Sequence, residues 1–571
     1  MPRLHQFVVS LAVTALLVAC STPASAPRQE RVDRGSEVTA AQESKTLVLA
    51  TRVEVTSLAH LPFWERRFTF LSTPRLFNAT LAILDERGLP RPYLAESLPA
   101  LNTDTWQVSP DGQMQTTYRL RPSLTWQDGT SMTAEDFVFT WRALTAPDLG
   151  VSNSQPQALM DSVTAPDPRT VVIHWRQPYP YANEMTEPFQ PLPRHILEPI
   201  FEQRAPDSFA AQSFWTRDYV NAGPYRVDRW EEGSFVEGQA FAGHALGRPK
   251  IDRIKVMFIP DPNTVLAYLL ADSIHVSFEN SIRLQQAQIL QREWAPRTGA
   301  TVFLAPTLWR AVQIQQRPEY ANPRSLTDVR IRKAIAHSMD REALNGAVLD
   351  GHGVITEFMI SPLVDYFAEV ERATVKHPYD TRRAEQLLNE AGYAKGSDGF
   401  FGSGGERFTT ELRGLTGAQQ EQELAILGAG WRQFGLDIRE STIPAFQGQD
   451  SQLQATLPGL FAGGAASGER NLANHTSTQV SRPENRWTGR NFIGWSNPEY
   501  DRLADAFART LDRSERTQQI AELGRAFTTD SPSVTMYFSI EVLAHSAGLT
   551  GPKLVPAESA QTWDIHSWEL R

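Results

Sequence analysis

The chain has 571 residues, of which 41% are hydrophobic, and a formal net charge of −10 at pH 7. A chain of this length exceeds a single hydrophobic core, so several domains are expected. The negative charge argues against nucleic acid or anionic lipid as a partner, because both attract basic surfaces. No apolar run reaches the roughly twenty residues that a membrane-spanning helix needs.

The chain opens with an apolar leader. Arg3 supplies a positive charge, and the sequence from Phe7 to Val18 is almost unbroken apolar. A helix of this length spans only about 18 Å, whereas a bilayer core is roughly 30 Å thick. The pattern therefore indicates a cleaved secretory signal rather than a membrane span, and it predicts an exported protein.

The leader ends in Leu17-Val18-Ala19-Cys20, which resembles the lipobox of bacterial lipoproteins. The resemblance implies a signal peptide of residues 1–19 and a lipid on Cys20, which anchors the protein at the periplasmic or extracellular face. Cys20 is the only cysteine, so no internal disulfide can form. Residues 20–44 carry almost no bulky apolar side chain after this cysteine. They are expected to form a disordered tether, so that the membrane is contacted through the lipid anchor only.

Helix start signals recur along the body, each a capping side chain, often with a proline, followed by apolar residues at helical spacing. They predict helices that begin at Thr133, Asp261-Pro262, Asp328, Asp380, Asn497-Pro498 and Asp512. The helix after Asp328 is expected to run without a break to Leu344, so that Asp340 would lie within it.

Strand-like runs alternate with these helices. They cover residues 45–50, 116–121, 170–175, 250–259 and 301–305. The glycine-rich stretch 396–405 is expected to form a surface hairpin or loop. Because strands and helices are mixed throughout, the fold class is α/β or α+β.

The sequence contains no motif that is typical of catalysis. The zinc-binding HExxH, the nucleophile elbow GxSxG and the phosphate-binding GxxxxGK[ST] patterns are all missing. We therefore expect a binding protein rather than an enzyme, without metal or cofactor. A secreted hydrolase with dispersed catalytic residues remains the alternative.

Several blocks in a fixed order carry a family resemblance. They are GLPRPYLAESL, YRLRPSLTWQDGTSMTAEDFVFTW, NAGPYRVDRW, RPKIDRIKVMFIPDPNTVLAYLLADSIHV, LTDVRIRKAIAHSMDREAL, YDTRRAEQLLNEAGY and FIGWSNPEYDRLADAF. Together they resemble the family 5 extracellular solute-binding proteins, the oligopeptide, dipeptide and nickel receptors of ABC importers.

This resemblance implies a hinged, two-lobed fold of the periplasmic-binding-protein type II with an extra inserted domain. Lobe I would comprise residues 45–80, 200–300 and 525–571. The inserted domain II would comprise 81–199, and lobe III would comprise 301–524. Such a protein is expected to be a monomer that closes on its solute, after which the permease subunits of an ABC importer recognise it.

Two segments are the candidates for contacting the solute. Trp309 and Arg310 follow a strand at a place where family members often line the cleft. Trp487, Arg490 and Asn491 combine an aromatic face with polar groups, and arginine can hold a carboxylate with two hydrogen bonds. The alternative for each tryptophan is ordinary core packing.

One departure from the family pattern concerns the solute. Peptide-binding members carry an acidic stretch whose aspartate pairs with the peptide amine, whereas residues 457–477 contain Glu469 as their single acid. A buried ammonium needs a partner. Either Glu469 replaces the aspartate, or the solute is an oligosaccharide or another compound without a free amine. A sensory binder without a transporter also remains open.

Overall fold

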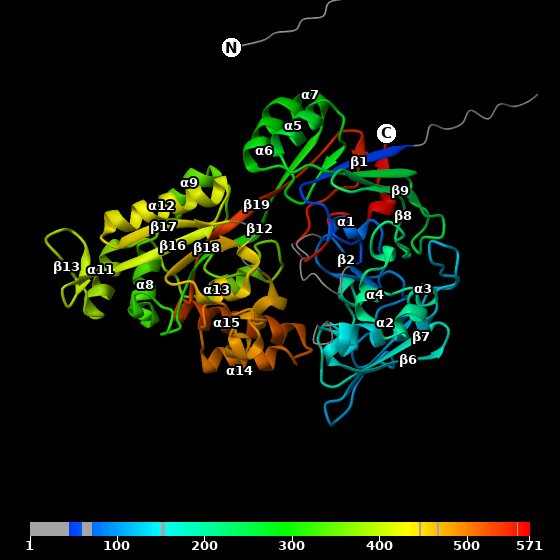
Figure 1. Cartoon of the computed structure of the whole chain (residues 1–571), viewed down its shortest axis with the longest axis horizontal. Coiled ribbons are helices and arrows are strands. Elements are labelled where there is room, and N and C mark those ends of the chain that lie inside the picture. The colour runs from blue at the N-terminus through cyan, green and yellow to red at the C-terminus, as the bar shows by residue number, and fades with distance from the viewer. Residues whose placement is uncertain (1–44, 60–70, 150–154, 445–446, 465–466, 557) are drawn as a thin grey trace, which may run out of the picture. The chain divides into compact units, whose positions relative to one another are not determined.

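A mixed ten-stranded sheet runs through the part of the chain that the structure describes (Figure 1). The computed structural model describes residues 45–59, 71–149, 155–444, 447–464, 467–556 and 558–571. The predicted signal peptide, Cys20 and the tether lie outside these residues. The strands, in sheet order, are β17 (Asp437–Ile443), β16 (Thr409–Leu415), β18 (Leu460–Gly464), β12 (Thr301–Ile314), β19 (Ser533–His545), β11 (Val276–Ser277), β1 (Thr46–Thr51), β10 (Arg253–Phe258), β9 (Phe235–Ala240) and β8 (Tyr225–Glu231).

Strands β12 and β19 are the longest and pair antiparallel along their length. The pairing runs from Thr301 opposite His545 to Gln313 opposite Ser533. Two register shifts interrupt it, between Pro306 and Leu308 and next to Arg310. Such irregularities bend and twist a strand pair. The predicted strand at 301–305 is thus confirmed as the first part of a longer one.

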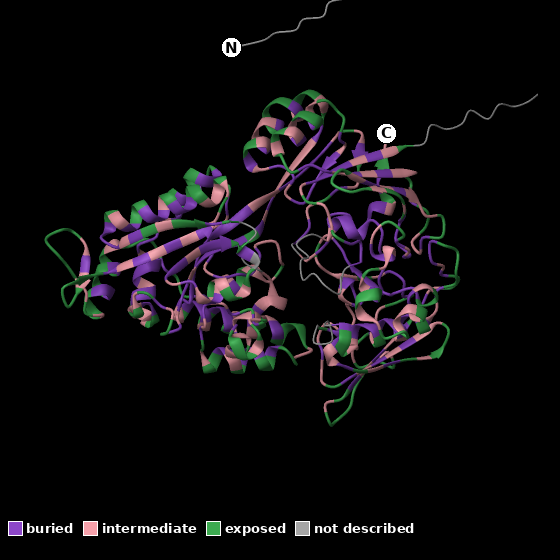
Figure 2. Cartoon of the chain, viewed as in Figure 1, coloured by how far each residue is buried: buried purple, intermediate pink, exposed green. Residues whose placement is uncertain are grey.

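The two ends of β19 pack in different cores. Val542 and Ala544 lie in a core with residues such as Val265, whereas Val534 and Met536 lie in a core that is built mainly from residues 312–462. Figure 2 shows most of the large sheet as buried. The long strand pair therefore connects two separately packed groups of elements.

A second, four-stranded sheet lies within residues 106–175. Its order is β4 (Trp106–Val108), β5 (Met114–Arg119), β7 (Thr170–Trp175) and β6 (Met160–Asp167). Helix α2 (Ala134–Thr145) begins after Thr133, whose backbone N–H donates to Asp136 Oδ2 at 2.8 Å. Phe137 of this helix shares a core with Trp175 of the sheet.

The predicted helix starts are confirmed. The helices are α5 (Pro262–Leu270), α8 (Val329–His337), α11 (Thr381–Glu390), α14 (Pro498–Phe507) and α15 (Arg513–Asp530). In each of these the preceding Asp or Asn side chain accepts a backbone N–H of the first turn. The other helices are α1 (Ser72–Arg75), α3 (Arg194–Phe201), α4 (Pro206–Ala210), α6 (Leu284–Ile289), α7 (Ala295–Thr298), α9 (Arg341–Leu349), α10 (Phe367–Ala373), α12 (Ala418–Phe434) and α13 (Ser451–Thr456).

The expected single helix from Asp328 to Leu344 was wrong. The structure ends α8 at His337 and starts α9 at Arg341. Asp340 Oδ1 accepts the backbone N–H of Ala343 at 2.9 Å, so Asp340 caps a new helix. Aspartate favours this cap over an interior helical position, which explains the break.

The glycine-rich stretch 396–405, for which a surface hairpin or loop is predicted, forms a hairpin. It contributes to a small sheet of β13 (Ala394–Lys395), β14 (Phe401–Ser403) and β15 (Glu406–Arg407). Two more strand pairs are β2 (Ala82–Leu84) with β3 (Pro90–Pro92) and β20 (Leu549–Thr550) with β21 (Glu569–Leu570).

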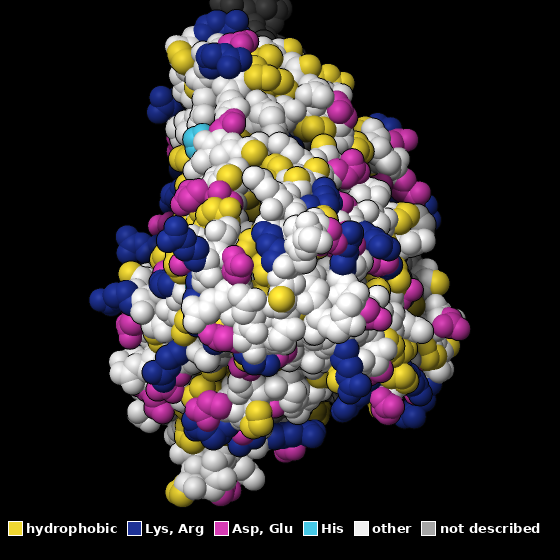
Figure 3. All heavy atoms as spheres, turned by 90° about the vertical axis from the view of Figure 1, so that its left-hand side faces the viewer, with side chains coloured by type: hydrophobic (Ala, Val, Ile, Leu, Met, Phe, Trp, Pro, Cys, Tyr) yellow, Lys and Arg dark blue, Asp and Glu magenta, His cyan; other side chains and the backbone are white. Residues whose placement is uncertain are grey.

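The apolar character of the helices and the distribution of surface charge both agree with the composition. In the described residues, no helix has both the length and the apolar character that crossing a membrane requires. On the face that Figure 3 shows, acidic and basic side chains are interspersed rather than gathered into a large patch of one sign. That face therefore lacks the extended basic surface that binding to a polyanion needs.

Candidate functional site

A polar cavity of about 610 Å³ lies among β12, β18, the 3-10 helix Glu469–His475 and residues 490–493. We call it the amide-lined cavity. Its lining includes six side-chain amides, those of Gln313, Gln420, Gln454, Asn471, Asn474 and Asn491. Its charged side chains are those of Arg310 and Arg490, and no described aspartate or glutamate lines it. Such a wall can donate and accept hydrogen bonds but carries no negative charge.

Asn491 carries an unpaired acceptor in the wall of this cavity. Its side chain is buried, and Nδ2 donates to the carbonyl oxygens of His475, Thr476 and Trp495 at 3.2, 3.1 and 2.8 Å. These three acceptors fix which end of the amide is nitrogen. Oδ1 therefore points the other way, and it has no hydrogen-bond partner in the described chain.

Arg310 lines the cavity from β12, and an ion pair fixes its guanidinium group. Its Nε donates to Glu423 Oε1 at 2.7 Å, and its Nη2 donates to the other oxygen of the same carboxylate. The hydroxyl of Tyr537 also donates to Glu423. Both partners of the ion pair are buried. Nη1 makes no hydrogen bond with a described residue, so its two N–H groups can serve a ligand.

His475 closes one side of the cavity. Its ring makes edge contacts with Trp309 and with Phe527, at centroid distances of 6.4 and 5.2 Å. Burial lowers the pKa of His475 to about 4. The imidazole is therefore neutral at pH 7, and it adds no charge to the cavity.

A second cavity, of about 340 Å³, is lined by Glu469 on the same 3-10 helix. We call it the Glu469 cavity. Residues from distant parts of the chain meet there, among them Tyr181, Glu184, Tyr366, Arg516 and Glu558. The two cavities thus share one short helix, because Asn471 lines the first cavity and Glu469 lines the second.

Carboxylates and guanidinium groups both surround the Glu469 cavity, whose lining also includes Asp365, Arg87 and Arg513. Glu469 pairs with Arg516 at 3.1 Å and accepts from the hydroxyl of Tyr366 at 3.2 Å. Arg470 pairs closely with Glu184 and lies 3.6 Å from Glu558. These contacts join three carboxylates to two guanidinium groups.

Two of these carboxyl groups titrate abnormally. Burial raises the pKa of Glu558 to about 7, although the charge of Arg470 acts to lower it. Burial also raises the pKa of Glu184. The Oε1 atom of Glu558 is buried and has no hydrogen-bond partner among the described residues. An added cation in this cavity would stabilise the ionised forms.

The structure distributes the predicted contact residues unevenly. Arg310, Arg490 and Asn491 come together in the amide-lined cavity, and Glu469 lines the neighbouring one. Trp309 is fully buried in a core, where Nε1 donates to Thr535 Oγ1 at 3.1 Å. Its environment in this structure matches the core-packing alternative.

Trp487 is half-buried with a positive φ of 59° and does not line the amide-lined cavity. The five other amides were not predicted from the sequence. Asn471 and Asn474 lie three residues apart on the helix that carries Glu469, and this spacing was a usable signal. Gln313, Gln420 and Gln454 come from a strand and two separate helices, so no local pattern connects them.

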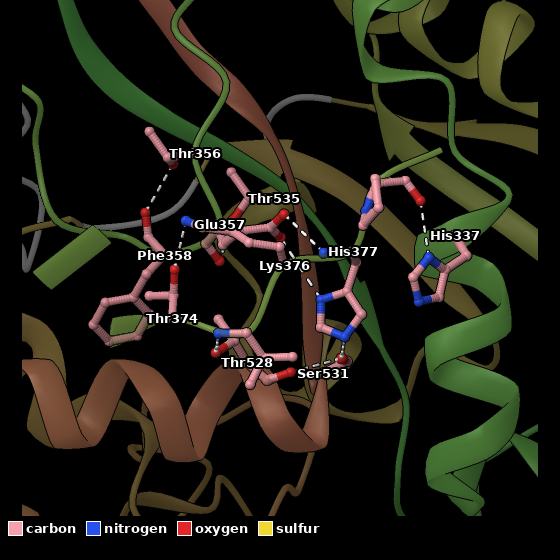
Figure 4. Close-up of polar contacts among 12 residues, drawn as sticks. His337, Thr356, Glu357, Phe358, Thr374, Lys376, His377, Thr528, Ser531 and Thr535 are labelled. Atoms are coloured by element: carbon pink, nitrogen blue, oxygen red, sulfur yellow. Dashed lines mark hydrogen bonds and ion pairs between the residues drawn. The ribbon is translucent and has the colours of Figure 1, made fainter. Parts of the chain in front are cut away.

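One cluster has the order of contacts found in serine hydrolases (Figure 4). Ser531 Oγ lies 3.3 Å from His377 Nε2, and His377 Nδ1 lies 3.7 Å from Glu357 Oε2. Ser531 and His377 are both buried, and Ser531 Oγ donates to the carbonyl of Thr528 at 3.1 Å. A substrate could not reach this serine in the conformation described.

Arg341 explains what the cluster does. Its Nη2 lies 3.3 Å from Glu357 Oε2. Although burial acts to raise it, hydrogen bonds from His377 and the charge of Arg341 hold the pKa of Glu357 below its ordinary value. The carboxylate of Glu357 is thus engaged in an ion pair with Arg341. The cluster connects the end of α15 to residues 374–377. Elsewhere too, no group of three or more His, Cys, Asp or Glu in the described residues could hold a metal ion.

The fold is the two-lobed periplasmic type, and solved structures agree. The oligopeptide-binding protein from Thermus thermophilus, complexed with a pentapeptide, superposes with a TM-score of 0.74 at 21% identity, over 92% of this chain and 96% of that one. NikZ from Campylobacter jejuni, in complex with Ni(L-His), gives 0.73 at 21% identity, over 92% and 99%.

The sequence comparison identifies the family. Residues 96–477 match the family model of the bacterial extracellular solute-binding proteins, family 5. The oligopeptide-binding protein AppA of Bacillus subtilis is 21% identical over 98% of this chain and 97% of its own length. The glutathione-binding protein GsiB of Pectobacterium atrosepticum is 25% identical over 79% and 82%. The chain belongs to the family 5 extracellular solute-binding proteins, which confirms the predicted family and the two-lobed type II fold.

Proposed function

We propose that this protein captures a peptide-like solute in the amide-lined cavity and delivers it to an ABC importer. The observation that carries this proposal is the cavity wall, in which six side-chain amides, that of Asn491 included, line one cavity. Peptide groups offer one donor and one acceptor each, which amide side chains can match. The names of two relatives, oligopeptide-binding and glutathione-binding, agree with a solute of this kind.

The Glu469 cavity is the proposed place for the amine of such a solute. Glu469 is itself engaged by Arg516 and Tyr366, so it does not act alone. The carboxyl groups of Glu184, Glu469 and Glu558 supply the attraction, because each of them can pair with an ammonium group. Glu469→Gln is expected to weaken binding of a peptide with a free amine about fivefold and to leave binding of its N-acetylated form unchanged.

A thermal-shift experiment distinguishes peptides from oligosaccharides. A ligand that binds only the folded protein raises its melting temperature. We expect a pool of short peptides to raise it and a pool of oligosaccharides to leave it unchanged. The variant Asn474→Ala, in the cavity, should respond less than Asn389→Ala, which alters an exposed asparagine on α11. A response to the oligosaccharides alone would overturn the peptide assignment.

The division into lobes is proposed on the same grounds. The long pair of β12 and β19 supports a hinge between lobe I and lobe III, since its two ends pack in different cores. The predicted boundary at residue 525 falls inside α15, whose Phe527 packs with Tyr500 and other residues of lobe III. A hinge predicts a smaller radius of gyration in solution once the solute is bound.

Export and anchoring complete the proposed function. The apolar leader and the sequence before Cys20 support a lipoprotein attached at the outer side of a membrane. The variant Cys20→Ser should be found in the soluble extracytoplasmic fraction, whereas the wild type should stay with the membranes. Equal amounts of both proteins in the membrane fraction would contradict a lipid on Cys20.

A further inference from the structure

Arg470 joins three segments that are far apart in the sequence. From the 3-10 helix in the proposed lobe III, it pairs closely with Glu184 of the proposed domain II, and its Nε lies 3.6 Å from Oε2 of Glu558 in the proposed lobe I. Its guanidinium also lies 4.1 Å from the ring centroid of Tyr181. We call these contacts the Arg470 clasp. A movement of lobe III away from the other two parts would break all of them.

Two more residues of the proposed lobe III make the same junction. Arg516 Nη2 donates to the hydroxyl of Tyr181 at 2.5 Å. Leu511 packs against the core that is built almost entirely from residues 79–189. The Arg470 clasp is therefore part of a larger contact between lobe III and domain II, and not an isolated surface ion pair.

The carboxyl group of Glu558 is poorly compensated within the clasp. Oε2 lies beyond hydrogen-bond distance of Arg470, and Oε1 is buried without a hydrogen-bond partner in the described chain. Arg470 is shared with the carboxylate of Glu184. Burial raises the pKa of Glu558 to about 7, and the charges of Glu469 and Glu184 act in the same direction, whereas that of Arg470 opposes them. The surroundings therefore favour the neutral form of this group.

The other groups around the cavity do not supply the missing counter-charge. Arg513 and Arg516 each pair with another acid, and Arg87 is exposed. Arg470 is thus the only described cation that pairs with Glu558. Besides the clasp and Glu469, the charged or titratable side chains of the cavity wall are Arg87, Tyr181, Asp365, Tyr366, Arg513 and Arg516.

We propose that the Arg470 clasp takes up one proton from solvent as lobe III closes on the solute, and that the carboxyl group of Glu558 receives it. This inference rests on the proposed function, and it names how solute binding is regulated. With the clasp open, Glu558 is expected to ionise as an ordinary glutamate in water, with a pKa near 4.5. The closed form therefore binds the proton more tightly than the open form. Solute affinity should be high near pH 5 and should fall as the pH rises through 7.

Calorimetry at pH 6, in buffers of different ionisation enthalpy, counts the protons taken up on binding. The probe is a pool of tetrapeptides with uncharged side chains, whose termini do not titrate near this pH. We expect the wild type to take up at least about 0.5 proton per bound peptide. Its affinity should be at least about fivefold higher at pH 5.5 than at pH 7.

Two variants assign the proton to Glu558. Glu558→Gln is neutral at every pH, so it should bind the pool without proton uptake, and at pH 7 it should bind more tightly than the wild type. Glu279→Gln is the matched control. Burial also raises the pKa of Glu279 to about 7, but its contacts with Thr51, Thr73 and Gln561 all lie within the proposed lobe I. This variant should keep the proton uptake, and circular dichroism will show that both variants fold.

The outcomes separate the inference from the proposed function. Binding by the wild type without proton uptake would overturn the inference and leave the peptide receptor standing, and this result does not depend on how the variants fold. Uptake that persists in Glu558→Gln, or that is lost in Glu279→Gln, would overturn the role of Glu558. If the wild type does not bind the pool at either pH, the peptide-receptor proposal fails, and the inference fails with it.

Discussion

Arg310 and Glu423 form a bidentate ion pair between β12 and α12, with Nε and Oε1 2.7 Å apart and both side chains almost fully buried. The hydroxyl of Tyr537 donates to the same carboxylate. Nε and Nη2 of Arg310 both donate to Glu423, whereas Nη1 takes no part in the pair and is available to the cavity. The orientation of one proposed ligand contact therefore depends on an acid that does not itself line the cavity.

Glu423→Gln should destabilise the protein strongly. The change leaves the guanidinium of Arg310 buried without its counter-charge, which costs about 3–5 kcal/mol of unfolding free energy. Urea unfolding of the variant measures the loss. Glu421→Gln, an exposed change on the same helix, serves as the control and should cost less than about 0.5 kcal/mol. Similar losses in both variants would contradict the account of the pair.

Ser533→Ala should separate stability from binding. The Ser533 hydroxyl is buried and has no hydrogen-bond partner in the described chain, so its removal should leave the melting temperature unchanged or slightly higher. Peptide affinity should fall if the hydroxyl contacts the solute. Calorimetry with the wild type as reference gives the affinity. A clear fall of the melting temperature without ligand would show that the hydroxyl has a structural partner.

Glu279 predicts a pH dependence of stability. Burial raises its pKa to about 7, although it accepts hydrogen bonds from Thr51, Thr73 and the backbone of Ser72. The folded state thus binds this proton more tightly than the unfolded state. The contribution of Glu279 to stability is therefore present below its ordinary pKa near 4.5 and is lost as pH rises to 7.

The variant Glu279→Gln isolates this effect, since other titrating groups cancel in the comparison. The unfolding free energy of the wild type, relative to the variant, should fall by about 2 kcal/mol between pH 5 and pH 8. Glutamine fits the site, because its oxygen can accept the two backbone N–H groups and its amide can donate to the threonine hydroxyls. A difference that does not change with pH would refute the assignment.

Arg470→Gln should loosen the contact between residues 181–184 and the 3-10 helix that carries Glu469. Arg470 pairs with Glu184 and Glu558, and its guanidinium lies 4.1 Å from the ring centroid of Tyr181. Because the side chain is partly exposed, the expected loss is about 1–3 kcal/mol. Adding Glu184→Gln should recover part of it, since the two residues are coupled.

Thermal unfolding of the single and double variants measures this coupling. Arg509→Gln breaks an exposed pair with Asp505 and should cost less than about 0.5 kcal/mol. Strictly additive losses for Arg470→Gln and Glu184→Gln would mean that the pair does not hold these segments together.

Local chemistry made much of the fold predictable. Asp261, Asp380 and Asp512 indicated their helices because a capping carboxylate acts within one turn. The same capping principle acts at Asp340, where the apolar pattern alone predicts one long helix and the structure has two. A capping side chain inside an apolar helical pattern therefore predicts a helix start as strongly as one that precedes the pattern.

The site was less predictable because it depends on contacts between distant segments. The chemistry of Arg310 and Asn491 makes them candidates in the sequence, and the fold brings them into one cavity. The role of Gln313 and Gln454 could not be predicted, since their neighbours in sequence show no pattern. Trp309 looked suitable for stacking, but the packing of β12 buries it.

Mass spectrometry of the compound that co-purifies with the full-length protein tests the central proposal most directly. The protein would be isolated from the extracytoplasmic fraction under native conditions and then denatured to release its ligand. The account predicts short peptides, and fewer of them from Asn474→Ala than from Asn389→Ala. A released oligosaccharide, or another solute without peptide bonds, would contradict it.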